Sequence, residues 1–133
     1  MNPLYPTIAA QANRRCEYCH APEEVFNFAF EVEHLLPQSR GGSDDLENLA
    51  LSCHGCNRFK SDFVRGYDDI TEQEVALFHP RRDLWEDHFA VDPETAQIFG
   101  KTPIGRATVQ RLQINRPQQI RARHRWMQLG LFP

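Results

Sequence analysis

The stretch EHLLPQSRGGSDDLENLALSCHGCNRFK, residues 33–60, decides the fold. Two Cys-x-x-Cys pairs accompany it, one before the stretch and one inside it. The four cysteines are Cys16, Cys19, Cys53 and Cys56. Four thiolates in two such pairs can surround one tetrahedral cation, and a closed set of four sulfurs leaves no open position for water. The sequence therefore predicts one structural Zn²⁺ per chain.

The N-terminal segment Met1–Arg15 has no basic stretch followed by an apolar run, and no apolar run in the chain is long enough to cross a bilayer. We therefore expect a cytoplasmic protein with no membrane partner. Disulfides are rare in that compartment, which favours metal thiolates. Two further interpretations of the cysteines stay open at this point. One is a zinc ribbon that only binds, and the other is a redox or metal-handling protein with reactive thiols.

The 133 residues fit a single domain, and their formal net charge is -3. The charge is unevenly distributed, because residues 101–133 contain seven basic side chains and no Asp or Glu. These are Lys101, Arg106, Arg111, Arg116, Arg121, Arg123 and Arg125. A basic end on an acidic body can bind phosphate locally, although the same pattern also fits a solvated helix face.

Local patterns predict the order of elements in the first half of the chain. Tyr5–Arg15 is expected to form a short helix. Apolar and polar residues alternate over Val25–His34, which is the period of a half-buried strand. A second short strand is expected at Leu49–Ser52, followed by a helix over about Gly55–Val64. Two strands and a helix should thus lie between and around the cysteine pairs.

The second half of the chain carries fewer motifs. Thr71–Phe78 is predicted to be helical, with Thr71 as the N-cap and Glu74 completing a capping box. Asp92-Pro93-Glu94 interrupts two apolar-rich runs, so a hairpin is expected within Trp85–Phe99. The remaining segments should form two basic helices. These are Ile104–Ile114, which starts after Thr102-Pro103, and Pro117–Leu129.

Several motifs occur in a specific order: an acid-His pair, Pro-x-Ser-Arg-Gly-Gly at 37–42, Asn-Leu at 48–49, and Cys-x-x-Cys-Asn-x-x-Lys at 53–60. This arrangement resembles the core of HNH nucleases, members of the His-Me finger group, and covers residues 14–62. The resemblance implies an α+β fold with a ββα-metal core in which two zinc knuckles share one zinc bound by all four cysteines. Residues 63–133 would then form an extension that ends in helices.

The resemblance also implies roles for the motif residues. His34 would be the general base, because a neutral imidazole can take a proton from water near neutral pH. Glu33 and Asn57 would hold a catalytic Mg²⁺ or Mn²⁺ through hard oxygen donors, although Asp is more usual at the position of Glu33. Asn48 would fix the loop and the orientation of His34 by hydrogen bonds.

Positive side chains near these motifs are candidates for contact with DNA phosphates. They are Arg40, Arg58 and Lys60 in the motif, and Arg121, Arg123 and Arg125 in the last predicted helix. The last three are expected to point outward. The sequence thus predicts an endonuclease that hydrolyses phosphodiester bonds of DNA, with structural zinc and a catalytic divalent metal. The alternative is a catalytically silent DNA-binding protein stabilised by zinc.

Overall fold

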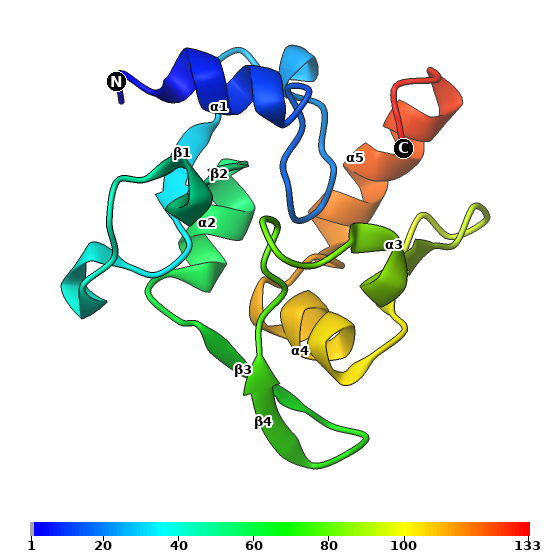
Figure 1. The fold of residues 1–133 in the computed structure, drawn as a ribbon. Coiled ribbons are helices and arrows are strands. Elements are labelled where there is room, and N and C mark those ends of the chain that lie inside the picture. Colours follow the sequence, from blue (N-terminus) through cyan, green and yellow to red (C-terminus); the bar gives the residue numbers. More distant parts are fainter. Residues whose placement is uncertain (1) are drawn as a thin grey trace.

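The computed structural model describes residues 2–133, which form an α+β fold of helices and small antiparallel sheets (Figure 1). The helices are α1 (Tyr5–Gln11), α2 (His54–Lys60), α3 (Trp85–His88), α4 (Pro103–Arg111) and α5 (Pro117–Gln128). The strands form three antiparallel pairs, which are β1 (Glu31–His34) with β2 (Leu49–Ser52), β3 (Arg65–Asp68) with β4 (Gln73–Ala76), and β5 (Phe89–Val91) with β6 (Ile98–Gly100). Within the described chain, none of the helices has the length and apolar character needed to cross a membrane.

The pair β1–β2 lies under α1 and leads directly into α2 (Figure 1). Its register sets Glu31 opposite Ser52 and His34 opposite Leu49. All four residues of β2 are buried, and this strand has the bounds that the sequence predicts. β1 is shorter than the predicted strand over Val25–His34, because β2 offers only four residues for pairing before the helix begins.

Helix α2 begins where Cys53 caps it, since the Cys53 sulfur accepts a hydrogen bond from the backbone N–H of Cys56 at 3.4 Å. The helix was predicted to run to about Val64. It ends at Lys60 instead, because Ser61 adopts a left-handed φ of 52°. The predicted helix is therefore present, and the chain turns away from it earlier than expected.

The predicted helix over Thr71–Phe78 is wrong, because the segment belongs to the hairpin β3–β4 that projects from one end of the molecule (Figure 1). The carboxylate of Asp68 accepts hydrogen bonds from the N–H and the hydroxyl of Thr71, at 3.1 and 2.6 Å, and so closes the turn. Gly66 lets β3 approach α4 closely, since a Cβ there would meet the Ala107 carbonyl oxygen at 3.2 Å. Tertiary packing has overridden the local helical pattern.

The hairpin expected within Trp85–Phe99 is present as β5–β6, after one helical turn in α3. The Asp92 side chain accepts from the N–H groups of Glu94 and Thr95, which forms the connecting turn. The two C-terminal helices are confirmed as α4 and α5. As predicted, α4 starts at Thr102-Pro103. The Thr102 hydroxyl caps it by accepting from the Gly105 N–H at 3.0 Å.

The faces of α5 differ from the prediction. Arg121 and Arg125 are exposed, but Arg123 is fully buried and Trp126 is buried beside it. Leu129, just after the helix, is 71 % exposed. Residues three apart lie on one face of a helix, so the buried side of α5 is the one that carries Arg123 and Trp126.

Residues beyond α2 hold the first Cys-x-x-Cys turn in place. The Arg81 guanidinium donates to the Leu49 carbonyl oxygen at 3.1 Å and forms an ion pair with Glu17. The Trp85 indole N–H donates to the Tyr18 carbonyl oxygen at 2.8 Å. The contacts with Glu17 and Tyr18 join the C-terminal extension to the segment between the first two cysteines, and the contact with Leu49 joins it to β2.

Candidate functional site

The four cysteines meet in one buried cluster. Cys16 and Cys19 come from the turn after α1, whereas Cys53 and Cys56 begin α2. Their sulfur atoms all lie within 4.8 Å of one another, and the sulfurs of Cys19 and Cys53 are 3.8 Å apart. A tetrahedron with Zn–S bonds of about 2.3 Å has S–S edges of roughly 3.8 Å. The cysteines are therefore positioned to bind a metal such as zinc.

Hydrogen bonding within the cluster shows why a cation belongs there. Hydrogen bonds from Cys16 and the other cysteines hold the pKa of Cys53 well below its usual range. Hydrogen bonds to the neighbouring sulfurs, followed by burial, raise the pKa of Cys56 well above its usual value. A dication among the sulfurs would let all four ionise. The cysteines are at most 4 % exposed, which argues against a redox role that needs accessible thiols.

Helix α5 covers the cluster. The Gln119 side-chain amide donates to the Cys19 sulfur at 3.5 Å. The buried Arg123 guanidinium donates to the carbonyl oxygens of Ala96 and Ile114, at 2.7 and 2.9 Å. Burial lowers the pKa of Arg123, while the negative charge of nearby cysteines opposes that shift. The expected contact of Arg123 with DNA is therefore wrong, because its charge lies inside the protein.

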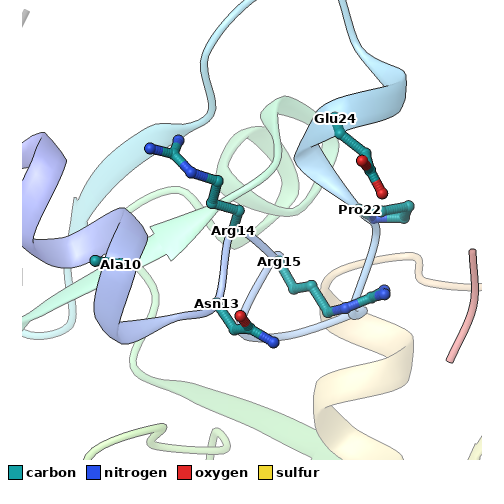
Figure 2. Close-up of a pocket in the computed structure, with 6 residues that line it drawn as sticks. All are labelled: Ala10, Asn13, Arg14, Arg15, Pro22 and Glu24. Carbon is teal, nitrogen blue, oxygen red and sulfur yellow. The ribbon is translucent and has the colours of Figure 1, made fainter.

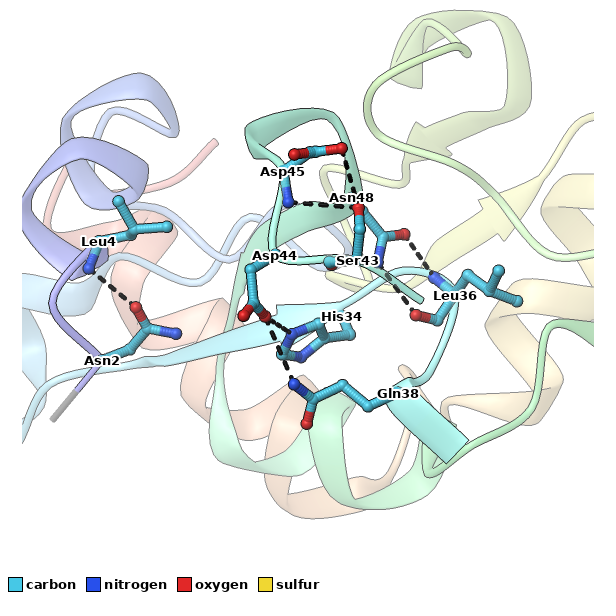
Figure 3. A network of polar contacts seen from close by, with 9 residues as sticks. All are labelled: Asn2, Leu4, His34, Leu36, Gln38, Ser43, Asp44, Asp45 and Asn48. Atoms are coloured by element: carbon cyan, nitrogen blue, oxygen red, sulfur yellow. Dashed lines mark hydrogen bonds and ion pairs between the residues drawn. The ribbon is translucent and has the colours of Figure 1, made fainter. Parts of the chain in front are cut away.

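His34 lies at the end of β1, where Asp44 fixes its ring (Figure 3). His34 Nε2 and Asp44 Oδ1 are 2.7 Å apart, and the Gln38 side-chain amide donates to the same oxygen at 3.4 Å. The His34 side chain is 20 % exposed and that of Asp44 is 73 % exposed. When Nε2–H donates to the carboxylate, Nδ1 is the ring nitrogen that remains to accept a proton. Sequence reasoning missed Asp44, since no spacing rule links it to a histidine ten residues earlier.

Asn48 braces the loop between β1 and β2 (Figure 3). Its amide donates to the carbonyl oxygens of Leu36 and Ser43, at 3.0 and 2.8 Å, and its oxygen accepts from the Leu36 N–H at 2.8 Å. Gly41 has a φ of 87°, and a Cβ on Gly42 would lie 1.7 Å from the Leu36 carbonyl oxygen. These contacts explain why the loop needs two glycines and an amide.

Glu33 and Lys60 form a buried ion pair, with Nζ 2.6 Å from Oε1 and the two side chains only 4 % and 3 % exposed. Burial raises the pKa of Glu33, and the charge of Lys60 opposes this rise. Two predictions are corrected by this geometry. Lys60 is enclosed and unavailable to DNA, and the Glu33 carboxylate is engaged by Lys60 rather than facing Asn57.

The carboxylate that meets Asn57 belongs to Glu31. The Asn57 amide donates to Glu31 Oε2, and His54 Nδ1 lies 3.2 Å from Glu31 Oε1. Glu31 and Glu33 point to the same face of β1, because alternate strand residues do. That rule could have identified Glu31 as a second candidate from the sequence. The structure thus brings Asn57 together with Glu31 and leaves Glu33 with Lys60.

Two hollows adjoin the His34–Asn48 loop. The larger, of about 680 Å³, lies between this loop and the hairpin β3–β4, and Asn48, Val64 and Arg65 are among its walls. The smaller, of about 300 Å³, is lined by Arg40 of the loop and also by Val64 and Arg65. The two hollows therefore adjoin at Val64 and Arg65.

A third hollow, of about 380 Å³, lies beside the end of α1 (Figure 2). Its arginines are engaged within the protein. Arg14 pairs with Glu23, and Arg15 donates to the carbonyl oxygens of His20 and Leu131. We assign no function to this hollow.

The family model described as HNH endonuclease matches residues 16–63. Neither the curated proteins nor the solved structures gave a match to the chain. The matched segment begins at the first cysteine, contains β1, β2 and α2, and ends just before the hairpin β3–β4. Residues 16–63 are thus similar in sequence to HNH endonuclease domains.

Proposed function

We propose that the protein is a metal-dependent endonuclease that hydrolyses phosphodiester bonds of DNA, with His34 as the general base. The observation that carries the proposal is the His34–Asp44 pair, which fixes one imidazole inside the segment that matches HNH endonucleases. Phosphodiester hydrolysis needs a base that deprotonates water near neutral pH, and imidazole has this property.

The chain's own residues supply the positioning that general-base catalysis requires. Asp44 accepts from Nε2 and so selects the tautomer in which Nδ1 is the base. Asn48 holds the loop that carries Asp44, through its bonds to Leu36 and Ser43. Water at Nδ1 would lose its proton to His34 as its oxygen bonds to phosphorus. The ester bond from phosphorus to the leaving sugar oxygen would break, and that oxygen would take a proton from solvent.

The proposal includes a divalent metal, and the surroundings of each candidate side chain indicate which ones can bind it. Glu33 does not fit, because its carboxylate is buried against Lys60. Glu31 and Asn57 fit better, since the Glu31 carboxylate meets the Asn57 amide and is 40 % exposed. Rotation of that amide by about 180° would turn its oxygen toward the same cation. Mg²⁺ or Mn²⁺ held there would offset negative charge on a phosphate. The cysteine cluster, by contrast, would take zinc as a structural ion.

The arginines available for phosphate contact are those that the structure leaves exposed. Among the arginines predicted to contact DNA, these are Arg40 and Arg58 in the matched segment, and Arg121 and Arg125 on α5. Such contacts fix the position of a nucleic acid without reading its sequence.

A second candidate function is DNA binding without catalysis. It is favoured by one observation, the buried pair of Glu33 and Lys60, which removes the carboxylate beside His34 from solvent. A protein of this kind would keep the zinc-stabilised fold and its exposed arginines and would lack a working metal site.

Incubation of purified protein with supercoiled plasmid, with and without Mg²⁺ or Mn²⁺, tests the proposal. We expect metal-dependent nicking or linearisation, and we expect His34→Ala to reduce the rate by about a hundred-fold to ten-thousand-fold. Zinc content and DNA affinity should stay near the wild-type values, because the polar partner of the His34 ring is Asp44, outside the cysteine cluster.

His124→Ala is the matched control, since His124 is an exposed histidine outside the matched segment. It should cleave at the wild-type rate. Cleavage by His34→Ala at that rate would overturn the assignment of the base. Wild-type protein that binds DNA and cuts with neither metal would establish the second candidate.

A further inference from the structure

The smaller hollow lies outside the proposed catalytic residues and carries both charge and aromatic surface. We name it the β3 hollow and define it by Arg40, Phe63, Arg65, Tyr67 and Arg111. Apart from Arg40 and Phe63, these residues lie beyond the segment that matches HNH endonucleases. The hairpin β3–β4 and the end of α4 therefore supply most of a surface for which the family match gives no role.

The charge of the β3 hollow suits an anion. Three arginines face one acid, Glu74, which gives a local balance of 3 − 1 = +2. Arg65 and Glu74 form an ion pair at 3.4 Å, but their side chains are 54 % and 68 % exposed. Such exposed pairs contribute little to stability, so Arg65 can exchange Glu74 for a phosphate. Arg111 has a buried Nε with no hydrogen-bond partner among the described residues.

The aromatic rings of the β3 hollow suit a base. Tyr67 is 48 % exposed on the outer face of β3, and Phe63 is 39 % exposed. The Arg111 guanidinium lies 3.9 Å from the centre of the Phe63 ring. This cation–π contact holds the ring and the positive charge of Arg111 next to each other. Exposed rings interleaved with arginines are the arrangement by which proteins stack unpaired bases and hold the adjoining phosphates.

We propose that the β3 hollow binds a short unpaired stretch of nucleic acid, with a base stacked on Tyr67 and a phosphate among Arg40, Arg65 and Arg111. The proposal rests on the proposed nuclease function and names the form of substrate that this surface recognises. A volume of about 300 Å³ accommodates one nucleotide rather than a duplex. In a duplex the faces of the bases are covered by their neighbours, so a ring can stack only on an unpaired base.

The hollow is also continuous with the proposed catalytic loop. Arg40 belongs to the loop that joins His34 to Asn48, and Val64 and Arg65 line both hollows. A strand held on Tyr67 can therefore extend into the larger hollow, whose walls include Ser43 and Asn48 of the loop that follows His34. An unpaired segment bound here would place an adjoining phosphodiester near that loop.

Binding of a fluorescently labelled single-stranded oligonucleotide, measured by anisotropy without added divalent metal, tests the proposal apart from catalysis. Tyr67→Ala should weaken binding by about ten-fold or more, because loss of one stacked base has an effect of that size. Tyr67→Phe keeps the ring and should bind like wild type. Arg65→Gln should lower the dependence of log affinity on log salt by about 0.7, the value for one phosphate contact on a single strand.

Phe99→Ala is the matched control, since Phe99 is 50 % exposed on the hairpin β5–β6 and lies outside the β3 hollow. It should leave binding unchanged, and all variants should keep the wild-type melting temperature and zinc content. Unchanged binding by Tyr67→Ala, or an equal loss with Phe99→Ala, would overturn the proposal. If Tyr67→Ala lost as much affinity for a duplex as for a single strand, the claim that the β3 hollow binds unpaired nucleic acid would be wrong.

The two proposals fail in different ways. If the wild-type protein cuts plasmid and Tyr67→Ala binds single strands as the wild type does, the nuclease proposal stands and the β3 hollow is not a binding site. If the wild-type protein never cuts and Tyr67→Ala loses single-strand binding, the β3 hollow is a nucleic-acid site and the nuclease proposal is wrong.

Discussion

At the scale of single residues, Glu31 and Glu33 show how two like side chains on one strand face acquire different properties. Glu33 lies deep against Lys60, where burial raises its pKa and the ammonium group compensates its charge. Glu31 lies nearer solvent against Asn57 and His54. A cation from solvent can approach Glu31 without breaking a buried ion pair, which is why we place the metal there.

The two carboxylates should therefore respond differently to the same substitution. Glu31→Gln should raise the Mg²⁺ concentration for half-maximal plasmid cleavage by about ten-fold or more and leave folding intact. Glu33→Gln should lower the free energy of unfolding by about 3 kcal/mol or more, because Lys60 is left as an unpaired buried charge. Metal titrations of the cleavage rate and urea unfolding measure the two effects. Equal metal dependence in wild type and Glu31→Gln would contradict the ligand assignment.

At the scale of elements, the hairpin β3–β4 depends on a contact that the local sequence does not reveal. The Arg106 guanidinium of α4 donates two hydrogen bonds to Asp68, at 2.8 and 3.1 Å, across 38 residues of chain. These bonds, followed by those from Thr71, hold the pKa of Asp68 well below its usual range. The hairpin is thus anchored by a charged pair between distant elements.

This pair gives a pH dependence whose sign follows from the lowered pKa. A carboxylate with a depressed pKa in the folded protein contributes stability that is complete above its unfolded pKa of about 4 and is lost as the pH falls below it. The stability difference between wild type and Asp68→Asn should therefore be largest near pH 7 and should shrink toward pH 3. Urea unfolding at several pH values measures this difference in unfolding free energy. The pH dependence of the cysteine cluster drops out of the difference, because both proteins contain the same cluster.

Asp69→Asn is the control for this series, since Asp69 is the exposed neighbour of Asp68. Its stability difference from wild type should be small at every pH. A difference for Asp68→Asn that stayed constant from pH 7 to pH 3 would show that the Arg106 pair contributes no pH-dependent stability.

Elements with local signals could be predicted from the sequence, and elements that depend on distant partners could not. The apolar run of β2 and the Thr102-Pro103 start of α4 are local features, and both were found. The hairpin at Asp68 depends on Arg106, and the ring of His34 depends on Asp44 across a loop. The cysteine spacing predicted the cluster, because each pair already fixes two sulfurs on one turn.

At the scale of the whole molecule, the cysteine cluster and the extension support each other. Trp85 of α3 stacks on His20 at 4.1 Å and donates to the Tyr18 carbonyl oxygen, which lies between the first two cysteines. Gln119 of α5 donates to the Cys19 sulfur. Loss of the metal should thus release the turn that both parts of the extension contact.

We therefore expect about one zinc per folded chain, and we expect chelation to unfold the matched segment and the extension in a single transition. Elemental analysis measures the zinc content. Near-ultraviolet circular dichroism follows Trp85 and Trp126 as zinc is removed. Cys56→Ser should lose the same near-ultraviolet tryptophan signals without a chelator. Native tryptophan signals in zinc-free protein, or less than half an equivalent of zinc in reduced folded protein, would contradict this prediction.

The cover that α5 places over the cysteine cluster also sets an order of events during synthesis. Cys56 completes the set of sulfurs, and Arg123 follows 123 − 56 = 67 residues later. At ribosomal rates of about 5–20 residues per second, that distance corresponds to roughly 3–13 seconds. The nascent chain thus presents an open tetracysteine site for several seconds before its lid is made. We expect metal to enter most easily in this interval, and later exchange to require displacement of Gln119 from the Cys19 sulfur.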